Sequence, residues 1–228
     1  MLKLKFKHLF LDIELETDES FAILGPNGSG KSLLLKVITH EMYPSRLYKR
    51  EVFSKNLTLE EARRTFGVVN SELEYFYKNE NITVFDAIIS SFKNALLVYN
   101  FFEFSEYEKK AALELCDRFN LNPKADVSKL SLGEIKKTLI ARAVIHNPKI
   151  LCLDEPTNGL DIKAKYEFYD LIKSLKQKTI LITHDFTEVK NYKKIFLLKK
   201  GRIVKCLKSL NKKDLSELFE VDEEKIIF

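Results

Sequence analysis

The chain has 228 residues, which is enough for one large domain or for a domain that carries a substantial inserted lobe. Hydrophobic residues make up 45% and charged residues 31% of the chain, so its composition excludes global disorder, and no apolar run is long enough to predict a membrane-spanning helix. The formal net charge of +5 is too small to indicate, by itself, binding to nucleic acid or to an anionic membrane.

The first 69 residues are predicted to form mainly strands. Apolar residues alternate with lysines over residues 2–7, which is typical of a half-buried strand, and apolar runs at 10–15 and 21–24 predict two more strands. After a predicted helix that ends near Thr39, we expect a strand near 51–53, a helix near 59–64 and a strand at 66–69.

From residue 71 onward the strand patterns stop and helical patterns take over. Helices are predicted at 83–92 and 105–119. We interpret residues 72–130 as a helical lobe inserted into a core of residues 1–71 and 131–228, the whole chain forming one domain.

The second half of the chain alternates helices and apolar strands, which predicts an α/β fold with a mostly parallel sheet. The expected helices are 131–146, 161–176, 185–190 and 214–219, and the expected strands are 150–153, 179–182, 195–198 and 202–206. Residues 199–201 are predicted to form the turn between the last two strands, and residues 226–228 an apolar end.

Two features favour an intracellular, reducing compartment. The first residues lack the continuous apolar stretch of a secretory signal. The three cysteines, Cys116, Cys152 and Cys206, have neither metal-ligand spacing nor the even number of a disulfide framework.

Residues 25–32 read GPNGSGKS and match the phosphate-loop pattern G-x-x-x-x-G-K-[ST], between a predicted buried strand and a predicted helix. Glycines let backbone N–H groups surround a phosphate, and the helix N-terminus adds a favourable dipole. Lys31 is expected to reach the β- and γ-phosphates, and the Ser32 hydroxyl to bind Mg²⁺. The alternative, a glycine-rich turn that precedes a lysine by chance, is disfavoured by the surrounding pattern. The residues expected to hold the nucleotide here are Gly25, Pro26, Asn27, Gly28, Ser29, Gly30, Lys31 and Ser32.

Two acids end the apolar strand at 150–153. An acid at the carboxyl end of a central parallel strand faces the ligand crevice, so Asp154 is expected to hold Mg²⁺ through water. Glu155 is the natural general base for an attacking water. The pair alone would be interpreted equally well as a cap at the start of a loop. Together with the phosphate loop it indicates a nucleoside triphosphatase.

Three more segments complete the pattern: 130–134 (LSLGE), 156–161 (PTNGLD) and 180–185 (ILITHD). In this order they resemble the signature loop, the D-loop and the switch histidine of ATP-binding cassette (ABC) ATPase domains, and the resemblance covers almost the whole chain. It implies a P-loop NTPase core, an N-terminal antiparallel β subdomain, an inserted helical subdomain, and ATP and Mg²⁺ as cofactors.

The resemblance also implies roles for individual residues. Ser131 and Gly133 would donate hydrogen bonds to the γ-phosphate of an ATP held by a second copy, in a head-to-tail dimer. His184 would bond the γ-phosphate and, with Lys31 and Glu155, complete the catalytic set. Asp161 would communicate across the dimer. A histidine met alone at a strand end would instead be interpreted as bonded to backbone.

Three positions depart from the family pattern. Leu132 replaces the usual glycine of the signature loop, and Ser71 stands where a Mg²⁺-binding glutamine normally ends a strand, so it is expected to act through water. For the aromatic residue that stacks on adenine, Phe6 and Phe10 are the candidates, with core packing the favoured role for both.

Segments 70–72 and 83–90 are similar to import subunits of the molybdate and iron-chelate types, and segment 212–219 is similar to the C-terminus of metal-chelate importers. The resemblance therefore predicts the ATPase subunit of an importer of metal chelates or oxyanions, in the cytoplasm on the inner face of the cell membrane. Its implied partners are a second ATPase subunit in a homodimer or heterodimer, an integral membrane permease and a substrate-binding protein, with no nucleic acid. The helical lobe would dock the permease, and its aromatic segments 75–77 and 99–104 are candidate contacts, unless they pack the core of the lobe.

Two alternatives remain. One is an ABC ATPase without a transport role, for example in cofactor assembly; a repair enzyme is disfavoured because no heptad array is present. The other is a degenerate regulatory domain, which Lys31, Glu155 and His184 argue against and which the departures at Leu132 and Ser71 keep open.

Overall fold

The computed structural model describes residues 1–226, so the last two residues of the predicted apolar end at 226–228 lie outside the described part of the chain. The chain divides into two compact units, Met1–Arg63 with the residues from Lys178 onward, and Arg64–Gln177. The lobe boundaries near residues 72 and 130 stay a prediction. None of the described helices has both the length and the hydropathy needed to cross a membrane.

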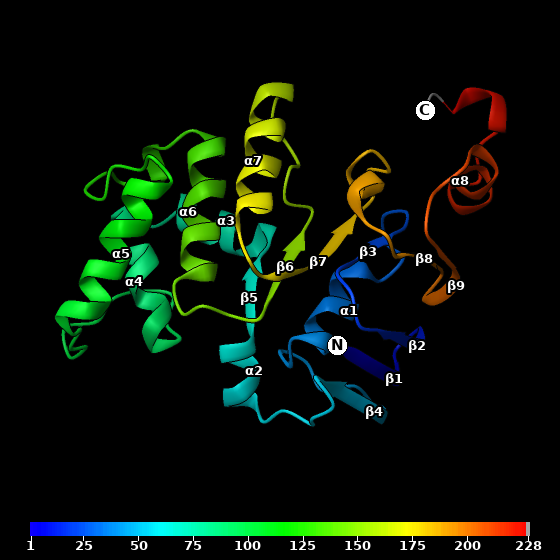
Figure 1. Ribbon diagram of the computed structural model, residues 1–228, viewed down its shortest axis with the longest axis horizontal. Helices are drawn as coiled ribbons and strands as arrows, with labels where there is room; N and C mark the ends of the chain where they lie inside the picture. Colours follow the sequence, from blue (N-terminus) through cyan, green and yellow to red (C-terminus); the bar gives the residue numbers. More distant parts are fainter. Residues whose placement is uncertain (227–228) are drawn as a thin grey trace. The chain divides into compact units, whose positions relative to one another are not determined.

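The first unit holds most of the strands (Figure 1). Its strands lie in the order β4-β1-β2-β9-β8-β3-β7. The strands β1, β2 and β4 pair antiparallel, whereas β3 pairs parallel with β7 and β8, so the predicted α/β fold with an antiparallel N-terminal part is confirmed. The elements are β1 (Leu2–His8), β2 (Leu11–Thr17), β3 (Phe21–Leu24), α1 (Lys31–Ile38), β4 (Arg46–Val52), β7 (Lys178–Thr183), η3 (Glu188–Asn191), β8 (Ile195–Lys199), β9 (Arg202–Leu207), α8 (Lys212–Phe219) and η4 (Glu223–Lys225). A further helix, α2 (Leu59–Thr65), contains the boundary between the two units.

The predicted alternation in β1 is confirmed. Leu2, Leu4 and Phe6 are buried, because side chains of a strand alternate between its two faces. The intervening lysines lie on the other face, opposite acids of β2. Their ion pairs are Lys3–Glu16, Lys5–Glu14 and Lys7–Asp12, with N–O distances of 2.6, 2.7 and 3.1 Å.

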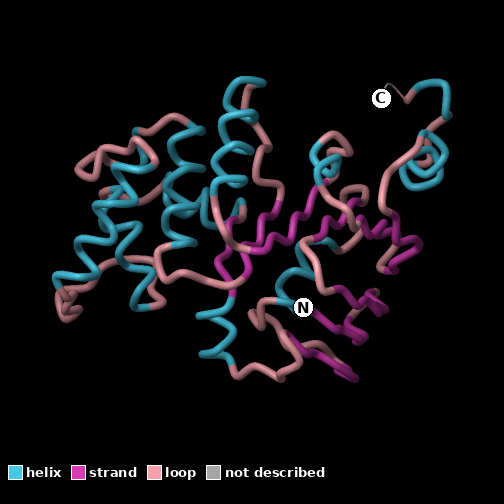
Figure 2. The backbone as a smooth tube through the Cα atoms, in the orientation of Figure 1, coloured by secondary structure: helices cyan, strands magenta, loops and turns pink. Residues whose placement is uncertain are grey.

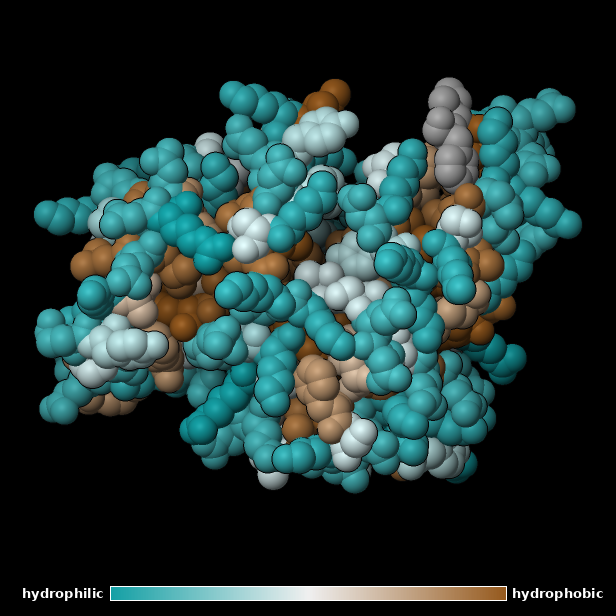
Figure 3. Space-filling model, in the orientation of Figure 1, coloured by the Kyte–Doolittle hydropathy of each residue, from teal (hydrophilic) through white to brown (hydrophobic). Residues whose placement is uncertain are grey.

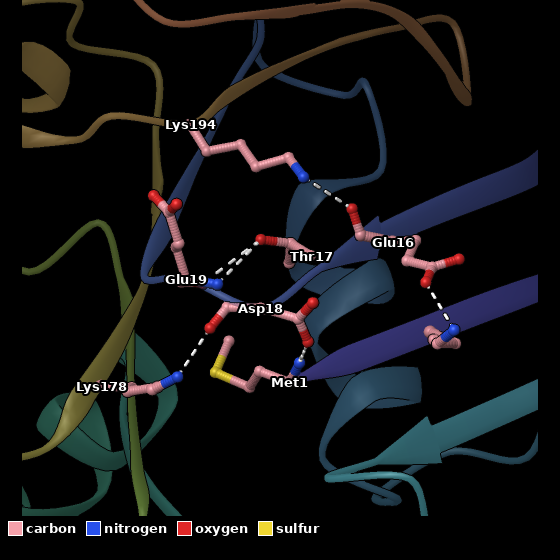
Figure 4. A network of polar contacts seen from close by, with 8 residues as sticks. Met1, Glu16, Thr17, Asp18, Glu19, Lys178 and Lys194 are labelled. Atoms are coloured by element: carbon pink, nitrogen blue, oxygen red, sulfur yellow. Dashed lines mark hydrogen bonds and ion pairs between the residues drawn. The ribbon is translucent and has the colours of Figure 1, made fainter.

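The end of β2 and the turn that leads to β3 are held by two lysines from elsewhere in the unit (Figure 4). Lys178, the first residue of β7, donates to the backbone oxygen of Asp18 at 2.6 Å, and Lys194, just before β8, donates to that of Glu16 at 2.8 Å. The Met1 amino group pairs with the Asp18 carboxylate. Lysine side chains thus satisfy backbone oxygens that the strands leave open.

In the second unit the chain between β5 and β6 forms helices joined by loops (Figure 2). β5 pairs parallel with β6. The elements are β5 (Phe66–Val69), α3 (Ser71–Lys78), α4 (Val84–Ile89), η1 (Ser90–Lys93), α5 (Glu106–Arg118), η2 (Val127–Lys129), α6 (Leu132–Val144), β6 (Ile150–Asp154) and α7 (Ile162–Ser174).

The helix α6 buries two charged side chains in the interior of this unit. Arg142 donates to the backbone oxygens of Ala87 and Ala95, both at 2.8 Å, and to Ser90 Oγ at 2.7 Å. Its guanidinium also lies 5.6 Å from the ring centre of Tyr77, on α3. One turn and a half earlier on α6, Lys136 is 2% exposed.

Lys136 pairs with Glu74 of α3 at 2.6 Å. Burial raises the pKa of Glu74, but hydrogen bonds from Lys136 and Lys78 outweigh it and hold that pKa below its usual value. Two pairs, Lys136–Glu74 and Arg142–Tyr77, therefore join α3 to α6.

Of the three cysteines, Cys116 and Cys152 are buried and Cys206 is exposed on β9.

Candidate functional site

The phosphate loop leaves β3 at Leu24 and enters α1 at Lys31. It lies so close to β8 that a Cβ at Gly25 would be 2.3 Å from the backbone oxygen of Leu198. A side chain at this position would push the loop away from the sheet, so glycine is required for close approach. The predicted strand-loop-helix context of the motif is confirmed.

The polar groups of this loop fit a phosphate. Lys31 is only 5% exposed, and its Nζ donates to the backbone oxygens of Gly25 and Pro26 at 3.0 and 3.1 Å. Ser29 Oγ is buried and has no hydrogen-bond partner among the described residues, which is the kind of polar atom that a bound oxyanion would satisfy. Ser32, in the first turn of α1, is exposed. Donors, a cation and a helix N-terminus thus converge on one loop.

The turn between β1 and β2 stands beside this loop. A Cβ at Gly30 would lie 3.1 Å from Cε2 of Phe10. Phe10 is 55% exposed, whereas Phe6 is fully buried. Core packing is therefore correct for Phe6 and wrong for Phe10, which offers an aromatic face to solvent next to the phosphate loop.

The predicted acids and the histidine follow strand ends as expected. Asp154 is the last residue of β6 and is buried, and Glu155 follows it with a backbone φ of 48°. In the other unit, His184 follows β7 and is exposed. The loop after it is shaped by Thr183, whose Oγ1 accepts from the Asp185 N–H at 2.9 Å. The roles of these residues stay predictions.

Ser71 is the first residue of α3, and its side chain is exposed. The sequence pattern predicts no helix over 71–78, where the structure has α3. The helix begins at Ser71 because the Asn70 side chain caps it, accepting from the Leu73 N–H at 2.9 Å.

Ser131 is the N-cap of α6 and shares a capping box with Glu134. The Ser131 hydroxyl donates to Glu134 Oε2 at 2.5 Å and accepts from the Glu134 N–H at 3.4 Å. The Ser131 hydroxyl and the Ser131 N–H, which donates to Glu134 Oε2 at 2.9 Å, hold the pKa of Glu134 below its usual value. Sequence analysis missed Glu134, although the Ser-x-x-Glu spacing is a recognised signal for a helix start.

The starts of α6 and α7 open into one pocket of about 350 Å³ within the second unit. Ser131, Gly133 and Asp161 line it, so the structure brings these three predicted residues together. Asp161 caps α7 by accepting from the Ala164 N–H at 2.8 Å. Leu132 packs against the loop before α7, since a Cβ added at Gly159 would lie 2.9 Å from Cδ2 of Leu132. The departure at Leu132 therefore forms a wall of this pocket.

A family model described as ABC transporter matches residues 10–158. Three relatives illustrate the similarity. An uncharacterized ABC transporter ATP-binding protein of Methanocaldococcus jannaschii is 33% identical over 85% of this chain and 76% of that protein. The lipoprotein-releasing system ATP-binding protein LolD of Bdellovibrio bacteriovorus is 30% identical over 84% of this chain and 89% of that protein. The zinc import ATP-binding protein ZnuC of Vibrio vulnificus is 29% identical over 77% of this chain and 60% of that protein.

Solved structures give the same result. A dimeric ATP-binding cassette in a post-hydrolysis state, bound to ADP and Pi, superposes with a TM-score of 0.75 and 26% identity over 92% of this chain and 100% of that chain. A transporter described as of metal-chelate type, in an inward-facing conformation, gives a TM-score of 0.75 and 25% identity over 96% of this chain and 88% of that chain.

Proposed function

The chain belongs to the family of ABC transporter ATPases, and on this premise we propose that it powers the import of a metal chelate or an oxyanion through a separate membrane permease. Support for import comes from relatives named for it, such as the zinc import protein, and from the metal-chelate-type neighbour. The chain would work in the cytoplasm, on the inner face of the membrane, with a substrate-binding protein on the other side.

The phosphate loop carries the ATPase part of this proposal, because a buried lysine and an orphaned serine hydroxyl meet at a helix N-terminus. Lys31 would leave the loop carbonyls and neutralise the β- and γ-phosphates. Ser32, Asp154 and Ser71 offer oxygen atoms, the ligands that Mg²⁺ prefers. When bound, this ion would neutralise charge on the phosphates.

The chemical step needs positioning and electrostatics more than covalent chemistry. Glu155 would orient a water and take its proton as the water oxygen attacks the γ-phosphorus and ADP leaves. His184 would hydrogen-bond the γ-phosphate. Phe10, exposed beside Gly30, would stack on the adenine.

The pocket lined by Ser131, Gly133 and Asp161 is the part that a second ATPase subunit would use. The N-terminus of α6 presents backbone N–H groups and a hydroxyl, which suit a γ-phosphate held by that subunit. To make this bond, Ser131 must give up its hydrogen bond to Glu134.

The proposed permease contact is an aromatic cluster in the loop before α5. Tyr99 and Phe101 stack at 5.6 Å and are 48% and 77% exposed. Phe102 packs against both rings. Apolar surface is visible over the helices of this unit in Figure 3. In the other aromatic segment, Tyr77 is buried and belongs to the core of the lobe.

The catalytic roles are tested by two substitutions in the purified chain. Glu155→Gln should bind ATP but hydrolyse it at least about 100-fold more slowly, and Lys31→Ala should weaken ATP binding itself. Wild-type turnover in Glu155→Gln would contradict the assigned base.

The transport role needs its own test, because a relative named for lipoprotein release is equally similar. The chain, reconstituted in vesicles with its permease, should drive ATP-dependent movement of radiolabelled molybdate or iron chelate toward the ATPase side. Movement away from that side, or none with any oxyanion or chelate, would refute the importer proposal.

Phe101→Ser should reduce co-purification with the permease, whereas Tyr107→Ser, equally exposed on α5, serves as the control.

A further inference from the structure

The turn between β8 and β9 touches both walls of the nucleotide site in the first unit. The Gly201 N–H donates to the backbone oxygen of Ser29, in the phosphate loop, at 3.2 Å. The Gly201 oxygen accepts from the Asp12 N–H, at the start of β2, at 2.9 Å. The backbone N–H and C=O of Gly201 therefore link the phosphate loop to the β1–β2 hairpin.

Gly201 is also clamped sterically. Its φ is +78°, in the left-handed region that favours glycine, and a Cβ there would lie 2.2 Å from the Phe10 oxygen and 2.8 Å from Phe10 Cδ2. Any side chain at this position must move the hairpin. Because Phe10 is the residue whose ring lies beside Gly30, the displaced group is the aromatic wall of the site.

The C-terminal helix α8 holds this turn from the other side. Lys199 donates to the backbone oxygen of Glu217 at 2.5 Å and pairs with the Glu220 carboxylate at 3.0 Å. Lys200, next to Gly201, pairs with the same carboxylate at 3.4 Å. Leu215 and Leu218 bury the apolar side of α8. A continuous set of contacts therefore runs from α8 through the turn to Phe10.

We propose that Gly201 is a positioning residue for the base of the nucleotide: it keeps Phe10 beside Gly30, and α8 steadies it through Glu220. The inference rests on the proposed binding of ATP at the phosphate loop with Phe10 against the adenine. The triphosphate is bound by groups of the loop itself, so a displaced hairpin weakens the hold on the base far more than the hold on the phosphates. Helix α8 thereby contributes to the affinity of the site for the nucleoside part of its ligand.

The test compares two ligands, ATP and inorganic tripolyphosphate, each with Mg²⁺, by calorimetry on the full-length chain. Gly201→Ala should weaken ATP binding by about 10-fold and tripolyphosphate binding by less than about 2-fold, since loss of a stacking contact is expected to cost a factor of this order. In steady-state kinetics KM for ATP should rise while kcat changes little. In a Phe10→Ala background the same substitution should leave ATP affinity within about 2-fold, because the ring is already gone.

Glu220→Gln tests the helix and keeps the proposal falsifiable should Gly201→Ala fold poorly. It should lower ATP affinity by about 2-fold and leave tripolyphosphate unchanged, because exposed ion pairs contribute little. Glu224→Gln makes the same charge change at an exposed site of η4 and should alter neither affinity.

The outcomes separate cleanly. Equal losses for both ligands in Gly201→Ala, or no loss for either, would overturn the positioning role while leaving ATP binding intact. An undiminished effect of Gly201→Ala in the Phe10→Ala background would overturn it as well. Failure of the wild-type chain to bind ATP or tripolyphosphate would instead refute the proposed function on which the inference rests.

Discussion

The phosphate-loop region and the helical interior around α6 are held together by different kinds of contact. Around the phosphate loop, the contacts are made by backbone atoms of glycines. Gly25 lies against the backbone oxygen of Leu198. Gly201 forms backbone hydrogen bonds with Ser29 and Asp12. Around α6, buried charged side chains from Lys136 and Arg142 make the connections. Apart from Lys31, which is assigned to the phosphates, the first region should tolerate a change of charge but not an added methyl group. The second should tolerate small changes of volume but not the loss of a charge.

The largest effect on nucleotide binding is expected from an added methyl group in the first region. Gly25→Ala puts a Cβ 2.3 Å from the Leu198 oxygen and 2.8 Å from Ser29 Oγ, so the loop must shift by about an ångström. We expect ATP affinity to fall by about 100-fold, as measured by calorimetry. Gly133→Ala is the matched change in α6, where the nearest atom is 4.0 Å away. It should raise the free energy of unfolding by about 0.5–1 kcal/mol, because alanine favours a helix. A destabilised Gly133→Ala variant would break the comparison.

Removal of the Arg142 guanidinium should be the largest charge effect. Arg142→Met removes the guanidinium hydrogen bonds to two carbonyl oxygens and one hydroxyl and should lower the free energy of unfolding in urea by about 3 kcal/mol. Arg118→Met, at an exposed arginine that bonds to Ser174, should cost less than about 1 kcal/mol. Equal losses of unfolding free energy in the two variants would show that the buried arginine contributes no more to stability than the exposed one.

Lys136→Met should lower the free energy of unfolding by about 2 kcal/mol at pH 7, because it leaves Glu74 with Lys78 as its remaining lysine partner. The pKa of Glu74 is depressed in the folded state, so its contribution is present above the ordinary glutamate pKa, about 4.3, and is lost as pH falls through the folded value. The gap between wild type and variant should therefore close below about pH 4. Urea titrations across this range measure it, and a gap that persists in acid would refute the ion-pair explanation.

The smallest effect is expected from an exposed ion pair in the first unit. Lys3→Gln removes the partner of Glu16 on the solvent face of the β1–β2 hairpin, where water screens both groups. We expect no measurable change of Tm by calorimetry. A clear fall would mean that charge also matters on the nucleotide side, and the contrast between the regions would weaken.

Much of the fold could be predicted because it follows from the spacing of apolar residues and from the residues that end each helix or strand. The alternation of residues 2–7 and the apolar strands before Gly25 and Asp154 determine where side chains are buried, and these elements are where we expected them. The strand predicted at 51–53 instead runs over Arg46–Val52, because an edge strand with two polar faces carries little hydrophobic signal. The helix predicted at 83–92 changes to a 3₁₀ turn at Ser90.

The candidate site was predictable only where the residue types and spacing of a motif indicate what the motif binds. The phosphate loop follows from such a motif, whereas the pocket shared by Ser131, Gly133 and Asp161 was not predicted. Helix α3 was missed because it is only eight residues long, buries Tyr77 alone among its described residues, and is capped by a single polar residue, Asn70. The exposure of Phe10 and the contacts of Gly201 depend on a turn far away in the sequence, and no local pattern encodes that neighbourhood.

The unequal burial of the three cysteines has a practical consequence. Burial, together with nearby Asp117, raises the pKa of Cys116 to about 11, and Cys152 is enclosed in β6, so neither thiol should react at neutral pH. Cys206 is exposed on β9, the strand that leaves the Gly201 turn. A maleimide dye should therefore attach to the natural chain at one position, and its fluorescence would report movement of that strand when nucleotide arrives, without any engineered handle.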